Sequence, residues 1–591
     1  MKRSKYKTKQ LITLLLAVLL CCTIFSGCSK SGIEPVSDSA NEPHESTDSS
    51  QVPTTASDPA DENAAADEPA GNFANENQKN AAIAAGYDAS KPYNGLTVPM
   101  GDGDTAFTLY QEMSTAVSKF NYDQNDMPVF QKREEITGVH VDFILSNDFA
   151  VQFPLMIASE DWPDMVAADI SDFAFDMSQY VEDGIAMDIS DIVEKNCPNY
   201  QFIRTQDDDT ARRTVSDEGK ILAFYQIRET AQPSWLGFCT FKDWHDEFGG
   251  AEAMDTIDEF ADYLRFLRDD KQVEYPLAYT NVLDNALLAT VDLHSSGWRV
   301  VNGEVQYCFT TDDFKEHITR MKAWYDEGIF NPNFYGMVGS PAFDFDGLYN
   351  EKYGVWWNSY ICLPIAEKAI KSLYNVDMIQ KGIATPTREE GGTRKVWTAH
   401  DPTLIAWQMS FIFETCSDPV TLCKWFDWHY TQEGSWISDY GVEGLSWNMG
   451  EDGKPVYVDE ILHPEDGTGS LTMIYANSIE WQPRLYNWRR EVDGILYGSG
   501  LEFMDILESN YVDEYSYPGG ATRTLEEAET YSTLMSDIET LVQENATKFV
   551  IGERSMSEWD DFQASLWQMG LQTCIDIQQA AYDRFMNRDI G

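Results

Sequence analysis

The chain has 591 residues, of which 43% are hydrophobic and 13% aromatic, and its 98 acidic residues against 42 Lys and Arg give a formal charge of −56. A folded body of about 500 residues exceeds what one hydrophobic core supports, which predicts two or more lobes. A field of this sign repels nucleic acid and anionic lipid and disfavours anionic ligands, so a neutral ligand fits best.

The N-terminus has the pattern of an export signal. Five basic residues precede an apolar run over 11–25, which is shorter than the roughly 20 residues of a membrane-spanning helix. The run ends at Phe25-Ser26-Gly27-Cys28, which resembles the lipobox of bacterial lipoproteins. We therefore predict a signal peptide over 1–27, lipidation of Cys28 and a lipid-anchored position on the extracellular face of the cell membrane. An ordinary signal peptide with an incidental Cys is the alternative.

Residues 28–95 are predicted to be a disordered acidic tether. They consist largely of Ser, Asp, Glu, Pro, Ala and Asn, with almost no large apolar residues. Such a segment buries too little surface to offset the entropy lost on ordering its backbone.

The first part of the body alternates between strand and helix patterns. We expect strands over 106–110 and 139–143, helices over 127–136 and 149–159, and a turn over 161–166 that enters a short buried strand. This alternation predicts an α/β lobe with a largely parallel sheet.

The later part is rich in helices. A capping box at Thr256 and Glu259 predicts a helix that follows, a second helix begins near Asp312, and another capping box, Ser555 to Glu558, introduces a third. Five tryptophans fall within helical patterns and are predicted to be packing residues: Trp244, Trp324, Trp425, Trp559 and Trp567.

Segments spread over the body carry a family resemblance. They read GVHVDF (138–143), SEDWPDMV (159–166), YVEDGIAMDISDIVEKNCPNY (180–200), DEGKILAFY (217–225), KDWHDEFG (242–249), TIDEF (256–260), MKAWYDEGIFNPNF (321–334), YGVEGLSWNMGEDGKPVY (440–457) and KFVIGERSMSEWDDFQASLWQMGLQTCIDIQQAAYDRF (548–585). In order and spacing they resemble the large, sugar-type lipoproteins of the extracellular solute-binding protein family 1.

The resemblance implies an α/β, periplasmic-binding-protein-like fold of type II, with two lobes joined by hinge segments and a ligand cleft between them. We expect the first lobe to hold 96–235 plus about 345–410, and the second 236–344 plus about 411–591. The resemblance also implies a monomer that delivers its ligand to the permease of an ABC importer. The ligand class expected is a neutral sugar or oligosaccharide, and a peptide stays open.

One departure concerns calcium. Some members of this family carry an Asp/Asn/Gly-rich calcium loop after the helix near TIDEF, whereas 268–276 here contain no Gly and no Asp/Asn alternation. Calcium needs about six to eight oxygen ligands around a tight turn. We therefore expect no calcium, no other metal and no cofactor.

No pattern in the chain predicts catalysis. The seven cysteines after Cys28 are scattered, which favours isolated buried thiols over a single disulfide. The chain has no G-x-S-x-G, H-E-x-x-H or Walker motif. The prediction is a binding protein and not an enzyme. The alternatives are a surface-anchored enzyme acting on polysaccharide, and a sensory or adhesive lipoprotein with the same fold.

The candidate ligand-binding residues follow from sugar chemistry, because aromatic faces suit the C–H patches of a sugar and planar amides or carboxylates suit its hydroxyls. Trp162 is expected at the carboxyl end of a strand, where open α/β sheets bind ligands. The adjacent Trp356 and Trp357 are expected on opposite sides of a strand, one in the core and one open. The full set of candidates is Asp161, Trp162, Trp235, Trp298, Trp356, Trp357, Asn358 and Trp447.

Overall fold

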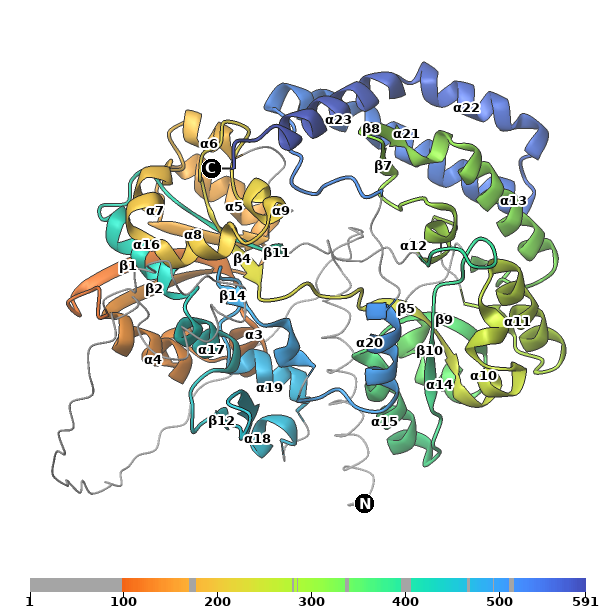
Figure 1. The fold of residues 1–591 in the computed structure, drawn as a ribbon, viewed down its shortest axis with the longest axis horizontal. Coiled ribbons are helices and arrows are strands. Elements are labelled where there is room, and N and C mark those ends of the chain that lie inside the picture. Colours follow the sequence, from red (N-terminus) through yellow and green to blue (C-terminus); the bar gives the residue numbers. More distant parts are fainter. Residues whose placement is uncertain are drawn as a thin grey trace, which may run out of the picture.

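The computed structural model describes residues 98–169, 177–278, 281–283, 285–334, 340–394, 405–464, 468–492, 494–509 and 515–590. The predicted signal peptide, Cys28 and the whole of the tether lie outside these residues. Within them, no helix has both the length and the apolar character needed to cross a membrane. Figure 1 shows two α/β lobes beside one another, with a layer of helices from the end of the chain reaching from one lobe toward the other.

The first lobe is built on a six-stranded sheet in the described residues, in the order β14-β4-β11-β3-β1-β2. Its strands are β1 (Thr105–Glu112), β2 (Val139–Ser146), β3 (Met165–Asp169), β4 (Phe224–Arg228), β11 (Ile405–Ile412) and β14 (Leu485–Tyr486). All of them run in one direction except β11, which is antiparallel to β3 and β4. The expected, largely parallel sheet is confirmed.

Both faces of this sheet are covered by other elements of the lobe. Successive side chains of its strands point to opposite faces, and those of both faces are buried. Leu109 and Ala167 pack into one hydrophobic cluster, whereas Tyr110 and Ala168 pack into another, against Phe149 of a helix. The helices of this lobe are α3 (Thr115–Phe120), α4 (Pro128–Thr137), α5 (Phe149–Ser159), α6 (Ser178–Glu182), α7 (Ser190–Asn196), α8 (Pro198–Arg204), α9 (Asp208–Arg213), α16 (Pro419–Trp428), α17 (Gln432–Tyr440), α18 (Asp459–Leu462) and α19 (Ser470–Ala476). A hairpin of β12 (Trp447–Met449) and β13 (Pro455–Tyr457) joins α17 to α18.

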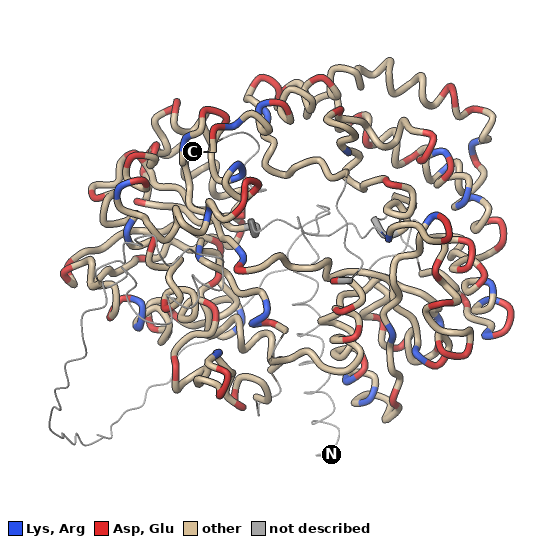
Figure 2. The backbone as a smooth tube through the Cα atoms, in the orientation of Figure 1, with Lys and Arg blue, Asp and Glu red and all other residues tan. Residues whose placement is uncertain are grey.

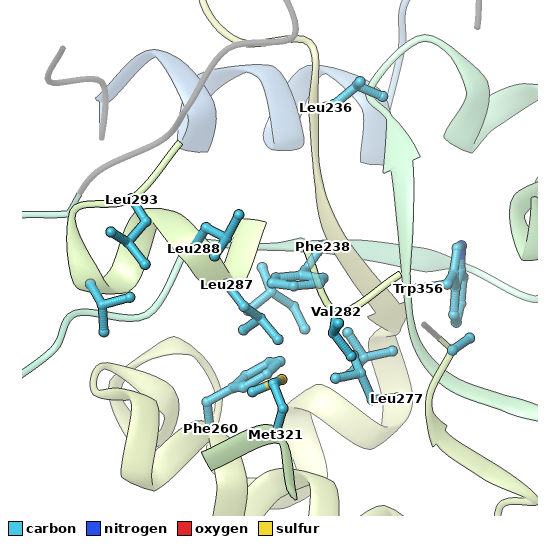
Figure 3. Close-up of a cluster of buried hydrophobic side chains, with 14 of the residues drawn as sticks. Leu236, Phe238, Phe260, Leu277, Val282, Leu287, Leu288, Leu293, Met321 and Trp356 are labelled. Carbon is cyan, nitrogen blue, oxygen red and sulfur yellow. The ribbon is translucent and has the colours of Figure 1, made fainter. Parts of the chain in front are cut away.

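The second lobe contains a four-stranded sheet in the order β10-β5-β9-β6. The strands are β5 (Leu236–Phe241), β6 (Tyr275–Leu277), β9 (Tyr353–Ser359) and β10 (Gln380–Ile383). Its helices are α10 (Lys242–Phe248), α11 (Ile257–Asp269), α12 (Asn285–Leu288), α13 (Asp312–Asp326), α14 (Phe345–Tyr349), α15 (Cys362–Tyr374) and α20 (Ser499–Ser509). Figure 3 shows part of the core, where Phe260 of α11 and Met321 of α13 lie near Phe238 of β5.

The last three helices belong to the same core as the second lobe. They are α21 (Leu525–Ile551), α22 (Trp559–Gln568) and α23 (Leu571–Met586), and they pack beside α13 and the hairpin of β7 (Trp298–Val301) and β8 (Glu304–Tyr307). Their buried residues, such as Ile538, Phe562 and Leu571, join one continuous cluster with Phe260 and Met321.

The strand pairing corrects the expected lobe limits. β9 and β10 pair in the second sheet, so most of the segment at 345–410 lies in the second lobe and not in the first. β11 and β14 pair in the first sheet, which places 405–412 and 485–486 in the first lobe. The chain therefore crosses three times between the sheets, after β4, after β10 and after β14.

Several local predictions are confirmed. The helix expected over 149–159 is α5, and both capping-box hydrogen bonds at Thr256 and Glu259 are present at the start of α11. Gly138 ends α4 in the left-handed conformation, with φ of 69°. All seven cysteines of the body are buried thiols. The prediction for Trp567 is wrong: its side chain is 44% exposed on the outer side of α22.

The buried Asp427 of α16 makes stability depend on pH. Its carboxylate accepts hydrogen bonds from Asn199 Nδ2 (2.6 Å) and from the Tyr200 backbone N–H (2.7 Å), which tie α16 to the first turn of α8. Burial raises the pKa of Asp427 from 3.8 to about 7. Between these values the folded protein keeps a proton that the unfolded chain has lost, so the free energy of unfolding falls as the pH rises.

We expect Asp427→Asn to flatten this dependence. Between pH 5 and pH 8 the wild-type protein should lose about 2.5–3 kcal/mol more stability than the variant does, because the folded pKa lies about two units above pH 5 and each unit is worth about 1.4 kcal/mol. In the variant, the new side-chain amide oxygen at position 427 still accepts from the Tyr200 N–H. The new amide nitrogen at position 427 donates to Oδ1 of Asn199 once the Asn199 amide has flipped. Urea unfolding at the two pH values measures the difference, and parallel losses in both proteins would contradict the assignment.

Candidate ligand-binding site

The three crossings connect one edge of the first sheet to one edge of the second. In the first lobe this edge holds the carboxyl ends of β1, β2, β3, β4 and β14. In the second lobe it holds the carboxyl ends of β6, β9 and β10 and the amino end of β5. Open α/β sheets bind ligands outside the carboxyl ends of their strands. The two joined edges are therefore the candidate site.

Hydrogen bonds connect the first and third crossings to one another between the two edges. The indole N–H of Trp488, two residues after β14, donates to the carbonyl and the hydroxyl oxygen of Thr230, both at 3.1 Å. Thr230 lies on the first crossing, two residues after β4, and Trp488 lies at the start of the third crossing. The backbone N–H of the neighbouring Glu229 donates to the Tyr486 carbonyl at 2.9 Å.

Glu229 places a carboxylate at this floor. It directly follows β4, and its side chain is exposed. The surrounding protein nevertheless desolvates the group, and this burial, with the nearby charge of Asp439, raises the pKa of Glu229 to about 7, although Lys454 opposes the shift. Water still reaches this carboxylate, because Glu229 keeps an exposed surface. Such a group can accept hydrogen bonds from hydroxyls.

Trp481 is the most unusual residue near the first edge. Its φ is 66°, in the left-handed region that a bulky side chain rarely adopts at a cost of about 1–3 kcal/mol. The indole is half-buried, and its Nε1 is enclosed without a hydrogen-bond partner in the described protein. Strain of this kind persists where the surroundings over-determine a conformation, and it gathers at ligand-binding positions.

The residues on either side of Trp481 hold it in place. Glu480 accepts hydrogen bonds from the backbone N–H (2.6 Å) and the hydroxyl (3.0 Å) of Thr115, three residues beyond β1. Gln482 accepts from Arg133 of α4 (2.6 Å) and donates to Oε1 of Gln111, the penultimate residue of β1 (2.9 Å). These buried contacts fix the backbone of Trp481 at the carboxyl end of β1.

The second edge carries two amide side chains with spare capacity. Gln232 on the first crossing donates to the Tyr360 hydroxyl at 3.4 Å, and its Oε1 is enclosed without a partner in the described protein. Asn358 in β9 accepts from the Ser359 N–H at 2.8 Å, and its Nδ2 is likewise enclosed without a partner there. An acceptor and a donor are thus held near the start of β5. Both side chains are buried, Gln232 with 9% and Asn358 with 1% of its surface exposed.

Four of the residues singled out in the sequence lie in or next to the second sheet. Trp235 immediately precedes β5, and its carbonyl accepts from the Tyr360 N–H at 3.1 Å. Trp356, Trp357 and Asn358 are consecutive in β9. Trp356 is fully buried against Phe241, whereas Trp357 faces the other side and keeps solvent contact. The alternation expected for the two adjacent tryptophans is confirmed.

The placement expected for Asp161 and Trp162 is wrong. They follow α5 and precede β3, so they lie at the amino end of the strand and away from the joined edges. The Trp162 indole N–H donates to the Ile157 carbonyl at 3.0 Å, and the ring stacks on Phe413. The short loop between α5 and β3 leads into the first residue of β3. Asp161 and Trp162 therefore lie at the edge of the sheet that is opposite the carboxyl end of this strand.

Trp298 and Trp447 are buried in the two hairpins and not at either edge. The Trp298 indole N–H donates to the Tyr531 hydroxyl of α21 at 2.8 Å. That of Trp447 donates to the Gly441 carbonyl at 3.0 Å, and its ring packs against Trp436. Their donors are used within the protein, which favours a packing role, and their contact with a ligand stays a prediction.

Acidic residues outnumber Lys and Arg in the chain, 98 to 42. Figure 2 shows Asp and Glu distributed over both lobes, with fewer Lys and Arg among them. In the described ranges, no group of three or more His, Cys, Asp and Glu side chains is placed to hold a metal ion. The expectation that no metal takes part stays a prediction.

Comparison with known proteins gives one curated relative over most of the length. The chain is 22% identical over 563 residues to the fructooligosaccharide ABC transporter substrate-binding protein FusA of Streptococcus pneumoniae serotype 4, covering 85% of this chain and 95% of FusA. The chain is a homologue of ABC-transporter solute-binding proteins. No protein-family model matches the sequence.

Solved structures of solute-binding proteins share the fold. An HMO-binding protein of Bifidobacterium longum infantis matches with a TM-score of 0.64 at 15% identity, over 82% of this chain and 99% of that one. The alginate-binding protein AlgQ2 matches with a TM-score of 0.62 at 19% identity, over 82% and 99%. FusA in complex with kestose matches with a TM-score of 0.62 at 17% identity, over 82% and 100%. The chain has the periplasmic-binding-protein-like fold of these solute-binding proteins.

Proposed function

We propose that this solute-binding protein takes a neutral oligosaccharide between its two lobes and delivers it to the permease of an ABC importer. The observation that carries the proposal is the pair of joined sheet edges, one bearing the strained Trp481 and the other the spare amides of Gln232 and Asn358. The half-buried Trp357 supplies a further aromatic surface at the second edge. FusA, named for fructooligosaccharides, supports this ligand class.

Binding works through the relative position of the lobes. A ligand that contacts both edges binds better when the edges are close, so it shifts the population toward the closed arrangement by its differential affinity. The excess of Asp and Glu over Lys and Arg, which Figure 2 shows spread over both lobes, disfavours an anionic guest.

Isothermal titration of the purified chain against a saccharide panel tests the proposal. The panel includes kestose, other neutral oligosaccharides and an anionic alginate oligosaccharide. We expect one neutral saccharide to saturate a single site, with compaction in small-angle scattering and the sugar recovered unchanged. Absence of binding to every neutral saccharide would refute the proposal, and release of new reducing ends would favour the enzyme alternative.

The anchor at Cys28 is part of the same proposal. It rests on the lipobox-like sequence before this residue and on the long polar segment after it. Fractionation of cells that produce the native chain and Cys28→Ser tests it. We expect the native protein with the membranes and the variant in the soluble extracytoplasmic fraction, and equal membrane association of both would rule the anchor out.

A further inference from the structure

The end of the chain leaves the second lobe and finishes on the first. Helix α23 packs within the core of the second lobe through Leu571 and Cys574. Its other end contacts α9 of the first lobe, and Figure 1 shows the end of α23 reaching from the upper layer of helices toward that lobe. This contact lies outside the three covalent crossings.

Asp217 is the centre of the contact. It lies in the loop after α9, and Oδ2 accepts from Arg584 Nε at 2.8 Å while Oδ1 accepts from Arg588 Nε at 2.9 Å. Arg588 is buried and also donates to the Arg212 carbonyl at 3.2 Å. Arg584 also pairs with Glu527 at the start of α21. One carboxylate of the first lobe thus holds two guanidinium groups of the second.

The aromatic ring of Phe585 packs between arginines of both lobes at this contact. Phe585 is buried, and the guanidinium carbons of Arg212, Arg213 and Arg588 lie 5.0–5.8 Å from its ring centroid. Arg212 and Arg213 belong to the first lobe and Arg588 to the tail, so the ring is shared between the lobes. Cation–π contacts of this kind strengthen when water is excluded.

The backbones also approach closely. A Cβ added to Gly219, which has φ of 76°, would lie 3.1 Å from the Asp589 carbonyl oxygen. The joint therefore combines ion pairs, a buried ring and a close main-chain approach, which distinguishes it from an exposed surface ion pair worth little.

The contact around Asp217 and the three crossings connect the two lobes at two separate places. The first crossing leaves from the carboxyl end of β4, whereas Asp217 lies on the connection that enters the amino end of that strand. We propose that Asp217, Arg584, Arg588 and Phe585 form an interlobe latch, which limits how far the two lobes separate.

The consequence for binding rests on the proposed function. A ligand that bridges the lobes binds the fraction of molecules in which they are close, and its apparent dissociation constant rises as this fraction falls. Release of the latch adds separated arrangements to the ensemble. Affinity should therefore weaken although no latch residue touches the site.

Fluorescence energy transfer between the lobes tests the latch without any ligand. Glu182 of the first lobe and Glu252 of the second are exposed, and cysteines placed there take dyes selectively because the seven native cysteines of the body are buried. Asp217→Asn keeps the side-chain shape and removes the charge. We expect lower transfer and a broader distance distribution than in the native chain.

The matched control is Asp191→Asn, which breaks the exposed pair with Lys195 at 2.9 Å in the same lobe and should leave the transfer unchanged. If Asp217→Asn unfolds, Arg588→Gln in the folded chain serves in its place, and Arg588→Lys should restore part of the transfer. Equal transfer in the native chain and the folded Asp217 or Arg588→Gln variants would overturn the latch.

Kestose supplies the second readout. With an intact latch we expect binding that Asp217→Asn weakens by about three- to tenfold through the smaller competent fraction. Unchanged or tighter kestose binding in the variant would contradict the coupling. Failure of kestose to bind either protein would show that kestose is not the ligand, and the distance measurement alone would then decide on the latch.

Discussion

Replacing Trp481 by alanine should weaken saccharide binding by about 30-fold or more, because a central tryptophan anchor typically contributes about 2 kcal/mol or more to a binding interface. The substitution removes the indole face and its enclosed N–H and leaves the anchors Glu480 and Gln482 in place. Isothermal titration with the saccharide that binds the native chain measures the loss.

A second substitution at the same position separates binding from stability. Glycine adopts the left-handed conformation without strain, so Trp481→Gly should recover part of the roughly 1–3 kcal/mol stored there while it loses binding as fully as the alanine variant. Trp567→Ala, which removes an exposed indole on α22, is the control and should bind normally. Native affinity in Trp481→Ala would remove this residue from the site.

Asp439→Ala should reduce the free energy of unfolding by about 3–5 kcal/mol, the usual cost of removing one partner of a buried ion pair. The Asp439 carboxylate has no solvent contact, and it accepts from Arg484 Nε and from the Asn487 N–H, both at 2.8 Å. Its truncation leaves the buried Arg484 without its carboxylate and releases the segment that leads from Trp481 to the third crossing.

Urea unfolding monitored by tryptophan fluorescence measures this loss. Asp439→Asn keeps an acceptor for one of the two donors and should lie between the alanine variant and the native protein. Asp191→Ala, at the exposed pair with Lys195, should change stability by less than about 1 kcal/mol. A loss of that small size in Asp439→Ala would mean that the segment after Trp481 is held by other contacts.

The local elements of this fold could be predicted because their signals are local. A capping box, a glycine after a helix and an alternating apolar strand each act within a few residues, and α5, α11 and β2 appear where these signals place them. The lobe limits could not be predicted, because the pairing of β9 with β5 joins residues more than 100 positions apart. No short pattern specifies which of two sheets such a strand enters.

The candidate site was predicted in part for the same reason. The alternation of side chains along a strand correctly predicted that one of Trp356 and Trp357 is buried and the other keeps solvent contact. That Trp357 and Asn358 contact a ligand stays a prediction. Trp162 was placed at the wrong end of its strand, because flanking polar residues mark a strand terminus without saying which one. Trp481 gave no signal: a positive φ at a tryptophan is imposed by the distant residues Thr115 and Gln111.

The Trp488 indole on the third crossing is hydrogen-bonded to Thr230 on the first. We therefore expect these two crossings to bend together when the lobes move. If either crossing flexed alone, the two segments would slide past one another and break this double contact. Lobe motion should therefore follow a single path, and a residue inserted into the first crossing alone should disturb it far more than a substitution of similar size on the outer surface.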